Sequence, residues 1–385
     1  MFRKIGDKLV CLNPWTHFEV NDPNGDVTMC CDFGRVLGNV KQDSIWSIWN
    51  SDSFVNVRKE MLYRGAESLC GNRCPALYGV KSYQSLQFYK DLPLDTDVYQ
   101  NASLNEQEIT EGRVILNSLP RWMRFAFSYH CNLKCYHCYQ YNTRMARTRL
   151  PTKFLDEMRA HLPYFQIMFH FGGEPFLFKE TDKLLIAAMD TNPYCRHFFV
   201  TNATVIRDEQ FDLLDRTNVG LIAVSLDAAL ASTYHRLRRG ASWGRTMEVL
   251  DRLSEMSIQK SFKLTFSMTL SKANYREIEK FFYLAKAKNA TPLVTVVGNP
   301  KGYTFFKRYL DFSQEEITAI LKQIERLSEG NWEIESRGCL RLLWDNMVNY
   351  RKENRYFWNW AKNRFRTVVP KPLYDPLRAF YKLIS

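Results

Sequence analysis

From residue 121 onward, short apolar runs alternate regularly with amphipathic stretches, and this alternation limits the folds open to the chain. The runs are rich in β-branched and aromatic residues, as expected for parallel strands that are covered on both faces. They span residues 121–129, 166–171, 197–203, 220–227, 263–270 and 292–298. A strand followed by a helical pattern, six times over, predicts an α/β fold with a partial (β/α)6 barrel of the TIM type. In such barrels the functional groups lie at the C-terminal ends of the strands.

The amphipathic stretches repeat apolar residues at helical spacing and predict the helices that follow these strands. They span residues 152–162, 180–190, 207–217, 245–256, 274–288 and 313–328. Ser313 precedes the last of them, and Glu316 follows three residues later. This is the pattern of a capping box, so we expect the last helix to begin directly after Ser313.

The rest of the chain has a different pattern, which predicts three further parts. Residues 1–79 hold Gly/Asn/Asp turn signals and five cysteines, and they predict a small separate domain. Residues 80–120 form a linker with one helix expected over 104–119, capped by Ser103 with Glu106. With the barrel over 121–330, residues 331–385 remain as a basic, aromatic C-terminal extension. This extension could lie on a membrane surface, grip an anionic polymer or pack as a helix on the barrel.

Composition places the chain in a broad class. With 385 residues, of which 45% are hydrophobic, it can bury a large core without disulfides. It has no run of eighteen apolar residues and no apolar secretion signal at its start, so we expect a cytoplasmic protein. The formal net charge of +12 suggests an anionic partner, namely a phosphorylated small molecule, nucleic acid or a membrane surface. A solvated basic surface without such a partner is the alternative.

Three of the ten cysteines crowd into one short stretch, "HCNLKCYHC", with the spacing Cys-x3-Cys-x2-Cys. Cys131, Cys135 and Cys138 directly follow the first predicted strand, at the end where a barrel carries its chemistry. A structural zinc site needs four closed ligands, which this stretch supplies only if His137 serves as the fourth. An iron–sulfur cubane with three thiolate ligands instead leaves one iron open for chemistry.

This cysteine spacing resembles that of the radical S-adenosylmethionine (SAM) superfamily. A second motif, "FGGEPFL", follows the next predicted strand, and its residues Gly172, Gly173, Glu174 and Pro175 match the segment that receives the methionine amino group in that family. The resemblance covers roughly residues 120–300. It implies that the open iron binds the SAM amino and carboxylate groups, and that reductive cleavage yields a 5′-deoxyadenosyl radical, which abstracts hydrogen from a substrate. It also implies a flavodoxin- or ferredoxin-type electron donor.

The same resemblance implies further SAM contacts at the strand ends. Candidate contacts to the adenine, the ribose or the carboxylate are His137, Thr201, Asn202, Ser225, Asp227, Ser267 and either Arg236 or Arg239. Polar residues are also common at strand ends as local caps, so each of these has a structural alternative.

A second cysteine set lies near the N-terminus. Cys11, Gly25 and Cys30 have the spacing Cys-x13-Gly-x4-Cys, and Cys70 and Cys74 follow in "CGNRC". The set resembles the SPASM module, or its shorter twitch form, in which four cysteines ligate an auxiliary [4Fe–4S] cluster. Here the module precedes the barrel, whereas in the family it normally follows it. Zinc held by the same four thiolates is the alternative, and the neighbouring Cys31 could replace Cys30 as a ligand.

Two cysteines remain outside these motifs. Cys195 and Cys339 are expected to be buried thiols, because cysteine is among the most buried residue types. A sharper hypothesis makes Cys339, in "SRGCLRL", the catalytic hydrogen-atom donor of an epimerase.

These observations together predict a radical SAM oxidoreductase or epimerase. It would abstract hydrogen from an sp3 carbon of a small sugar-like or phosphorylated molecule and oxidise or epimerise it. Modification of a peptide or protein substrate is the alternative reaction. An alternative of another class is a non-catalytic metal-cluster protein that binds nucleic acid, for which binding should weaken steeply with salt.

Overall fold

The structure is a computed structural model. It describes residues 2–5, 7–31, 33–70, 74, 86–138, 140, 147–296 and 312–333, together with 336, 338, 340 and 343. The chain forms two compact units, the first made of residues 1–223 and 255–263 and the second of 224–254 and 264–385. Cys339 and residues 351–385 lie outside the described residues, and so does most of the predicted extension.

The first unit is built on one sheet that joins the N-terminal segment to the first three barrel strands. Its strand order is β8-β7-β6-β3-β4-β5. β6 (Trp122–Ala126), β7 (Ile167–Phe171) and β8 (Arg196–Thr201) run parallel to one another. The N-terminal β3 (His17–Val20) extends them by pairing in parallel with β6, while β4 (Asp26–Thr28) and β5 (Gly38–Asn39) follow antiparallel. The predicted boundary near residue 79 therefore separates two stretches of sequence and does not separate two sheets.

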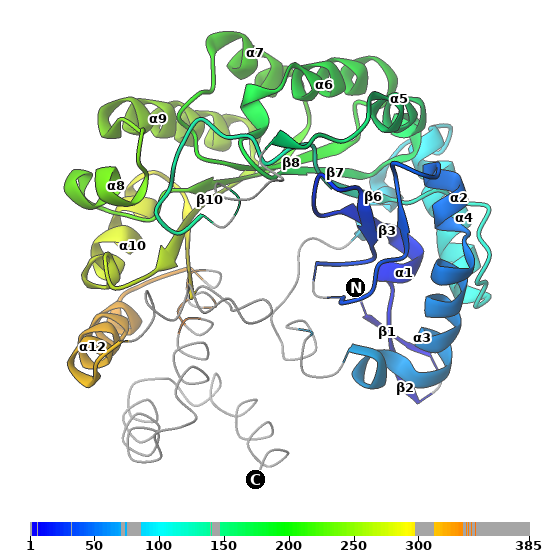
Figure 1. Cartoon of the computed structure of the whole chain (residues 1–385), viewed down its shortest axis with the longest axis horizontal. Helices are drawn as coiled ribbons and strands as arrows, with labels where there is room; N and C mark the ends of the chain where they lie inside the picture. Colours follow the sequence, from blue (N-terminus) through cyan, green and yellow to red (C-terminus); the bar gives the residue numbers. More distant parts are fainter. Residues whose placement is uncertain are drawn as a thin grey trace. The chain divides into compact units, whose positions relative to one another are not determined.

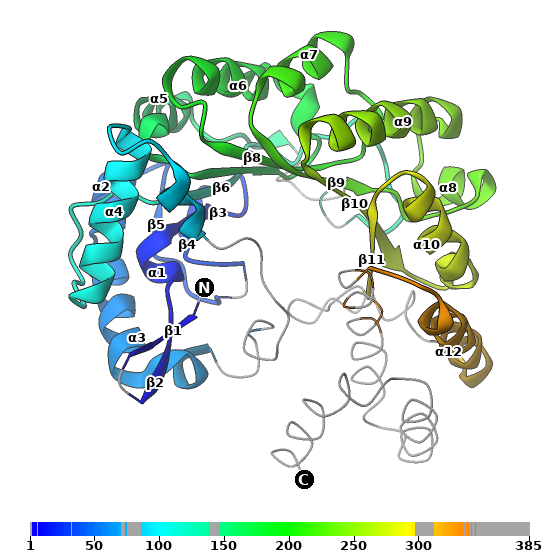
Figure 2. The same cartoon turned by 180° about the vertical axis from the view of Figure 1, so that it is seen from behind.

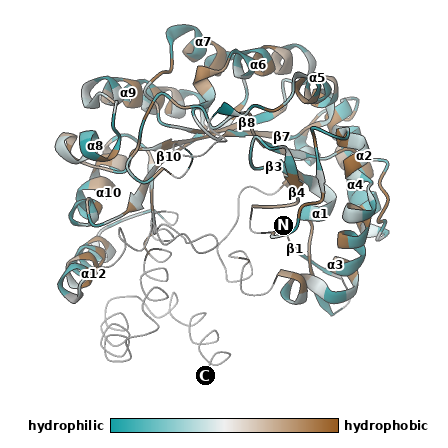
Figure 3. Cartoon of the chain, viewed as in Figure 1, coloured by the Kyte–Doolittle hydropathy of each residue, from teal (hydrophilic) through white to brown (hydrophobic). Residues whose placement is uncertain are grey.

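One face of this sheet is covered by helices. Phe18 of β3, Met123 of β6 and Met168 of β7 belong to one buried apolar cluster, which also takes in side chains from the covering helices. Those helices are α2 (Ile45–Trp49), α3 (Asp52–Cys70), α5 (Thr152–His161) and α6 (Lys179–Thr191). Figures 1 and 2 show α5 and α6 side by side along the strands, and each helix carries hydrophilic and hydrophobic stripes (Figure 3). A single core thus spans the N-terminal segment and the barrel strands.

The opposite face of the sheet carries a second, aromatic cluster. Because strand side chains alternate between faces, Trp122, Phe169 and Phe198 point away from the helices. Leu86 and Phe88 of the 3-10 helix η3 (Leu86–Asp91) pack against these rings. The linker between the two stretches of sequence therefore covers part of this face.

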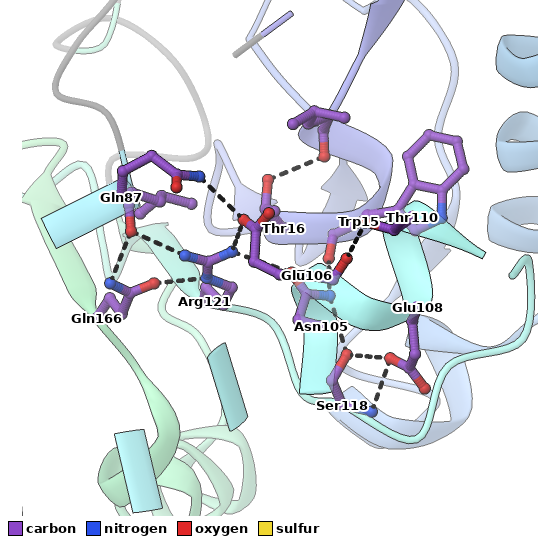
Figure 4. A network of polar contacts seen from close by, with 12 residues as sticks. Trp15, Thr16, Gln87, Asn105, Glu106, Glu108, Thr110, Ser118, Arg121 and Gln166 are labelled. Carbon is purple, nitrogen blue, oxygen red and sulfur yellow. Dashed lines mark hydrogen bonds and ion pairs between the residues drawn. The ribbon is translucent and has the colours of Figure 1, made fainter. Parts of the chain in front are cut away.

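A buried polar network fastens the same linker to the N-terminal ends of the strands (Figure 4). Arg121, which is fully buried, donates to Gln166 and to the main-chain oxygen of Leu86, and its Nη1 lies 2.6 Å from Glu106. Glu106 also pairs with Arg3 of β1 (Phe2–Ile5), which forms a two-stranded antiparallel sheet with β2 (Lys8–Cys11). A buried arginine is costly unless its donors are satisfied, and here several partners share it.

The linker helix differs from the prediction. α4 spans Asp97–Thr110 and begins after Thr96, whose hydroxyl accepts a hydrogen bond from the Tyr99 N–H. The predicted start at Ser103 and end at residue 119 are wrong, because Thr96 supplies an earlier cap. Gly112, at φ +67°, lies just past the end, where a left-handed residue commonly terminates a helix.

The second unit continues the same alternation of strands and helices. β10 (Lys263–Leu270) pairs in parallel with β11 (Thr291–Val296). The predicted capping box is confirmed, because Ser313 and Glu316 bond reciprocally at the start of α12 (Gln314–Glu329). This unit also contains α8 (Ala231–Leu237), the 3-10 helix η7 (Tyr275–Glu277) and α10 (Ile278–Ala287). β9 (Val219–Ser225) and α9 (Trp243–Lys260) cross the boundary between the units.

The predicted fold class is confirmed by the order of the elements along the chain. Each strand from β6 to β11 is followed by a helix, with α7 (Asp208–Arg216) after β8. The six predicted strands are all present, and their bounds differ from the predicted ones by a few residues. Among the described residues, no helix combines the length and apolar character needed to cross a membrane.

Three buried histidines make stability depend on pH. Burial lowers the pKa of His17 and of His197 to about 3, and it lowers the pKa of His170 well below its usual value. The His170 and His197 rings stack and share a hydrogen bond of 3.0 Å. All three are therefore neutral in the folded state, whereas in the unfolded chain each binds a proton below about pH 6.5.

We predict that the unfolding free energy falls as the pH is lowered from 7.5 to 6.0, by about 0.8 kcal/mol for each buried histidine. The sign follows because the unfolded state binds more protons in this range. Anaerobic denaturant titrations at the two pH values measure it. His197→Leu should lower this pH dependence by the contribution of one histidine. An equal pH dependence in wild type and His197→Leu would contradict the prediction.

Candidate functional site

The stretch with three cysteines follows β6, and its base is closed by local hydrogen bonds. Ser128 forms an antiparallel bridge with Arg149, and its hydroxyl donates to the main-chain oxygen of Thr148 at 2.9 Å. The Leu150 N–H donates to the oxygen of Phe127 at 3.0 Å. The cysteines thus lie on a loop, hereafter the cysteine loop (residues 129–138), which starts from this closed base beside the end of β6.

The Gly-Gly pair after β7 lies directly against the start of this loop. Gly172 and Gly173 have φ values of +84° and +54°, which side chains rarely tolerate. A Cβ atom on Gly173 would lie 2.1 Å from the main-chain oxygen of His130, and one on Gly172 would lie 2.6 Å from the Cβ of Ala126. The two glycines therefore permit a backbone approach that no other residue would allow.

Glu174 ties the ends of β7 and β8 together. It is fully buried, and its N–H donates to the His130 oxygen at 3.0 Å. Its carboxylate accepts from the Thr201 hydroxyl and from the Asn202 N–H, each at 2.7 Å. The structure thus brings together three of the predicted cofactor residues. Because protein donors already engage the Glu174 carboxylate, its side chain orients the strand ends. The buried Pro175 opens the short helix η6 (Pro175–Leu177) behind it.

The sulfur of Cys131 has the surroundings that a thiolate ligand needs. The Leu133 N–H and the Asn202 side-chain amide lie 3.4 and 3.5 Å from its Sγ, within reach as donors. Burial nevertheless raises the pKa of the Cys131 thiol to about 11, with smaller effects from Glu174, Cys135 and Cys138. The two N–H donors can stabilise a negatively charged sulfur. A metal that binds Cys131 would displace the thiol proton, so the raised pKa does not prevent coordination. Three thiols on one loop therefore fit an iron–sulfur cluster with three protein ligands.

Other residues on and beside the cysteine loop complete this site, and the sequence analysis missed three of them. Asn132 accepts from the Asn202 amide at 3.0 Å and donates to the Thr204 hydroxyl at 2.8 Å. Gln140 accepts from the Gly173 N–H at 3.1 Å. Thr204 lies two residues after the predicted Asn202, and Asn132 lies inside the cysteine motif, so both could have been predicted from their positions. The predicted His137 is partly buried on the same loop.

Two glycines shape the N-terminal cysteine set. Gly25, at φ +92°, closes the turn between β3 and β4, and a Cβ there would meet the Asn39 side chain at 2.9 Å. Gly65, at φ +75°, kinks α3, whose final turn ends at Cys70. The pKa of Cys11 is raised to about 12, mainly by burial and in smaller part by the charges of Cys70 and Cys74. The kink thus brings Cys70 within electrostatic range of Cys11.

Cys30 and Cys31 differ in their surroundings. Cys30 is partly buried and packs with Cys70 against the apolar cluster that contains Cys11, whereas Cys31 is exposed. This arrangement favours Cys30 as the fourth thiolate beside Cys11, Cys70 and Cys74. Within the described ranges, no three His, Cys, Asp or Glu side chains converge closely enough to hold a single metal ion.

The second unit holds the remaining predicted SAM contacts at the ends of β9 and β10. Asp227 adopts φ +64°, and its carboxylate accepts from the Thr269 N–H at 2.7 Å and pairs with Arg238 at 2.6 Å. The partly buried Ser267 donates to the Val224 oxygen, and Ser225 is also partly buried. Asp227 is thus engaged by the protein itself, and its side chain holds the end of β9 to β10.

The two candidate arginines of the second unit lie at and just beyond the end of α8. Arg236 lies in the last turn of α8, is exposed and donates to the Ala273 oxygen at 2.7 Å. Arg239 is also exposed. The buried arginine of this segment is Arg238, which sequence reasoning did not single out. Helical spacing could have identified it, since Arg238 lies four residues after the buried Tyr234.

The unassigned cysteines are only partly described. Cys195 is wholly buried, and burial raises the pKa of its thiol, as expected for a packed structural residue. Cys339, the hypothetical hydrogen donor, lies outside the residues that the structure describes.

Two protein families match this arrangement. Residues 125–285 match the radical SAM superfamily, and residues 11–75 match the iron–sulfur cluster-binding domain called SPASM. The class is therefore that of radical SAM proteins with an auxiliary-cluster domain. The chain carries a radical SAM domain with a SPASM domain at its N-terminus, as the sequence predicted. These domains imply a [4Fe–4S] cluster that binds SAM, an auxiliary cluster and SAM itself.

Curated relatives align with less than half of the chain. One is the AdoMet-dependent heme synthase of Methanosarcina barkeri, which is 28% identical over 183 residues, 46% of this chain and 50% of that protein. Another is the mycofactocin maturase MftC of Mycobacterium tuberculosis, 24% identical over 46% of this chain and 44% of that protein. The chain thus spans about half the length of the curated relatives it matches.

Solved structures resemble the chain more distantly. SuiB of Streptococcus suis bound to its precursor peptide SuiA is 17% identical, with a TM-score of 0.44 over 81% of this chain and 68% of that one. The enzyme anSMEcpe with bound AdoMet and a Cp18Cys peptide is 18% identical, with a TM-score of 0.40 over 53% of this chain and 57% of that one.

We predict that Gly173→Ala disrupts the cysteine loop. The new Cβ would overlap the His130 oxygen at a backbone angle that already disfavours alanine, so we expect a loss of about 1–3 kcal/mol of stability. We also expect SAM to bind at least tenfold more weakly, as measured by equilibrium binding after anaerobic reconstitution. Gly244→Ala is the matched control, because a Cβ there meets nothing within 4 Å. Equal SAM affinity in the two variants would argue against the proposed backbone contact.

We predict that Cys30→Ala and Cys31→Ala differ in iron content. If Cys30 is the auxiliary ligand, its loss should remove about four irons per reconstituted chain, whereas Cys31→Ala should keep the wild-type content. Iron and sulfide assays with Mössbauer spectroscopy measure the difference. Iron loss in Cys31→Ala alone would assign the ligand to Cys31.

Proposed function

We propose that the chain is a radical SAM enzyme that cleaves SAM reductively and abstracts hydrogen from an sp3 carbon of its substrate. The observation that carries this proposal is the fit between the cysteine loop and the Gly172–Gly173 turn. Three thiols lie on that loop, and the turn and the carboxylate of Glu174 hold its base against the ends of β7 and β8. When bound, the cluster and SAM would supply a 5′-deoxyadenosyl radical.

In this proposal the protein's residues bind and orient. Cys131, Cys135 and Cys138 would hold the cluster, with the Asn202 amide near one sulfur. Main-chain groups of the Gly-Gly turn lie beside the loop, where they would receive the methionine end of SAM. Glu174 sets the positions of Thr201 and Asn202, so that the β8 end keeps a fixed distance from the loop. Such fixed polar groups favour catalysis because they need not reorganise during the reaction.

The auxiliary site would be closed. Cys11, Cys30, Cys70 and Cys74 would supply four thiolates, so no iron would remain open to substrate. We therefore assign this site to electron transfer, for example acceptance of the electron left after hydrogen abstraction and deprotonation. An electron-accepting cluster supports oxidation of the substrate radical. Epimerisation would instead need a second group that donates a hydrogen atom to that radical.

We infer that the substrate is a peptide or a protein segment. The sequence alone favoured a small sugar-like molecule, and that reading stays a prediction. The peptide alternative has better support, because a relative that aligns with 46% of this chain is named a maturase. The relative named a heme synthase is the more similar of the two, so oxidation of a tetrapyrrole is the second candidate.

We predict two reactions from the anaerobically reconstituted protein. With SAM and dithionite alone, it should release 5′-deoxyadenosine slowly. With a peptide encoded beside its gene, it should also yield a product about 2 Da lighter for each oxidation, since two hydrogens leave as a proton–electron pair and a hydrogen atom. Liquid chromatography with mass spectrometry measures both, and Cys135→Ala is the inactive control.

The outcomes separate the candidates. No 5′-deoxyadenosine from a preparation with a full iron content would overturn the radical assignment. If 5′-deoxyadenosine is released and a tetrapyrrole is altered while the peptide is not, the radical assignment stands and the substrate is a tetrapyrrole. Steeply salt-dependent nucleic-acid binding without SAM cleavage would favour the non-catalytic alternative.

A further inference from the structure

The cysteine loop is held by a second contact, on the side away from the Gly-Gly turn. The hydroxyl of Tyr129 donates a hydrogen bond of 2.9 Å to the main-chain oxygen of Asn21. Tyr129 is buried and lies two residues before Cys131, while Asn21 directly follows β3 of the SPASM domain. A residue at the start of the SAM-cluster loop is thus anchored on the domain that carries the auxiliary cysteines.

Asn21 is itself fixed by a polar network. Its side-chain oxygen accepts from Arg124 at 2.8 Å, and its amide nitrogen donates to Thr28 at 3.0 Å and to Glu19 at 3.2 Å. Arg124 also pairs with Glu19 at 3.2 Å and lies over the Phe171 ring at 4.1 Å. Strands β3, β4, β6 and β7 therefore all contribute to the position of the Asn21 carbonyl.

The register of the sheet explains why these residues meet. Glu19 lies opposite Arg124 in the β3–β6 pair and opposite Thr28 in the β3–β4 pair. Val20, the last residue of β3, lies opposite Phe125, so Asn21 follows β3 beside the chain that leads from β6 to the cysteines. A buried or half-buried ion pair contributes little net stability, so the main effect of the Arg124–Glu19 pair is to fix the positions of the side chains around Asn21.

The peptide between Tyr129 and His130 is therefore fixed from two directions. Gly173 approaches it so closely that a Cβ would lie 2.8 Å from the Tyr129 carbonyl carbon. The Tyr129 hydroxyl fixes the same residue to β3. This peptide leads directly to Cys131, so a displacement at either contact moves the first cluster ligand.

We propose that Tyr129 is a positioning residue through which the SPASM domain sets the SAM-cluster loop. The SPASM domain would then have two roles, since it binds the auxiliary cluster and also forms part of the support for the SAM site. This role does not depend on the identity of the substrate. It can be tested with SAM alone.

The test compares Tyr129→Phe with wild type in the full, reconstituted chain. Removing the hydroxyl deletes one hydrogen bond and keeps the buried ring, so we expect SAM to bind about fivefold more weakly. The electron paramagnetic resonance signal of the reduced SAM cluster should change in the presence of SAM. Amide hydrogen exchange in residues 129–138 should become faster, while the iron content and the thermal midpoint stay close to wild type.

Tyr63→Phe is the matched control. Tyr63 lies on α3 of the same domain, is 78% exposed, and keeps its ring beside Lys8 after the substitution. It should change none of these quantities. Asn21→Ala should reproduce the Tyr129→Phe effects, and the double variant should lose less than the two single losses added together.

Wild-type SAM affinity and an unchanged spectrum in Tyr129→Phe would overturn the proposal. If Tyr129→Phe does not fold, wild-type SAM affinity and an unchanged spectrum in Asn21→Ala would overturn the proposal instead. Additive losses in the double variant would also overturn it, because they would mean that the two residues act independently. Since SAM binding is measured without substrate, none of these results bears on the peptide assignment.

Discussion

The parallel pairing of β3 with β6 is the interaction on which the rest of the first unit depends. It places His17 beside Trp122 and Glu19 beside Arg124, so that side chains from two distant stretches of sequence alternate on the same two faces. The His17 and Trp122 rings stack at 4.8 Å on one face, while Phe18 and Val20 join the helix-covered core on the other. Because one register error would exchange these faces, the pairing is strongly specified.

The site built at the end of this sheet relies on backbone as much as on side chains. Two glycines allow the β7 turn to touch the cysteine loop, and a buried carboxylate then joins that turn to β8. Each contact fixes where the chain runs, which leaves the cysteines partly exposed on a supported loop. This division of labour is typical of functional loops that a rigid scaffold positions.

Much of this arrangement could be predicted from the sequence, because the relevant signals are local. The alternation of strands and helices predicted the six βα units, the cysteine spacings predicted the two domains, and Ser313 with Glu316 predicted a helix start. The start of α4 was missed because Thr96 and Ser103 are both acceptable caps, and only tertiary packing chooses between them. The pairing of β3 with the barrel strand β6 is non-local, and no motif within residues 17–20 predicts it.

The roles of the polar residues were harder to predict for a related reason. Glu174 and Asp227 are carboxylates at strand ends, where a cofactor contact and a structural tie have the same sequence signature. In the structure, both accept main-chain N–H groups from the adjacent strand. The contact between Tyr129 and Asn21 could not be predicted from the sequence, because it joins residues 108 positions apart and its acceptor is a main-chain oxygen.

The most direct test of the central claim is native-state hydrogen exchange of the β3 and β6 amides at low denaturant. If the N-terminal segment and the barrel strands share one cooperative sheet, these amides should open with the same free energy and the same denaturant dependence. Exchange of the β3 amides through a separate, smaller opening, with β6 still protected, would contradict this account.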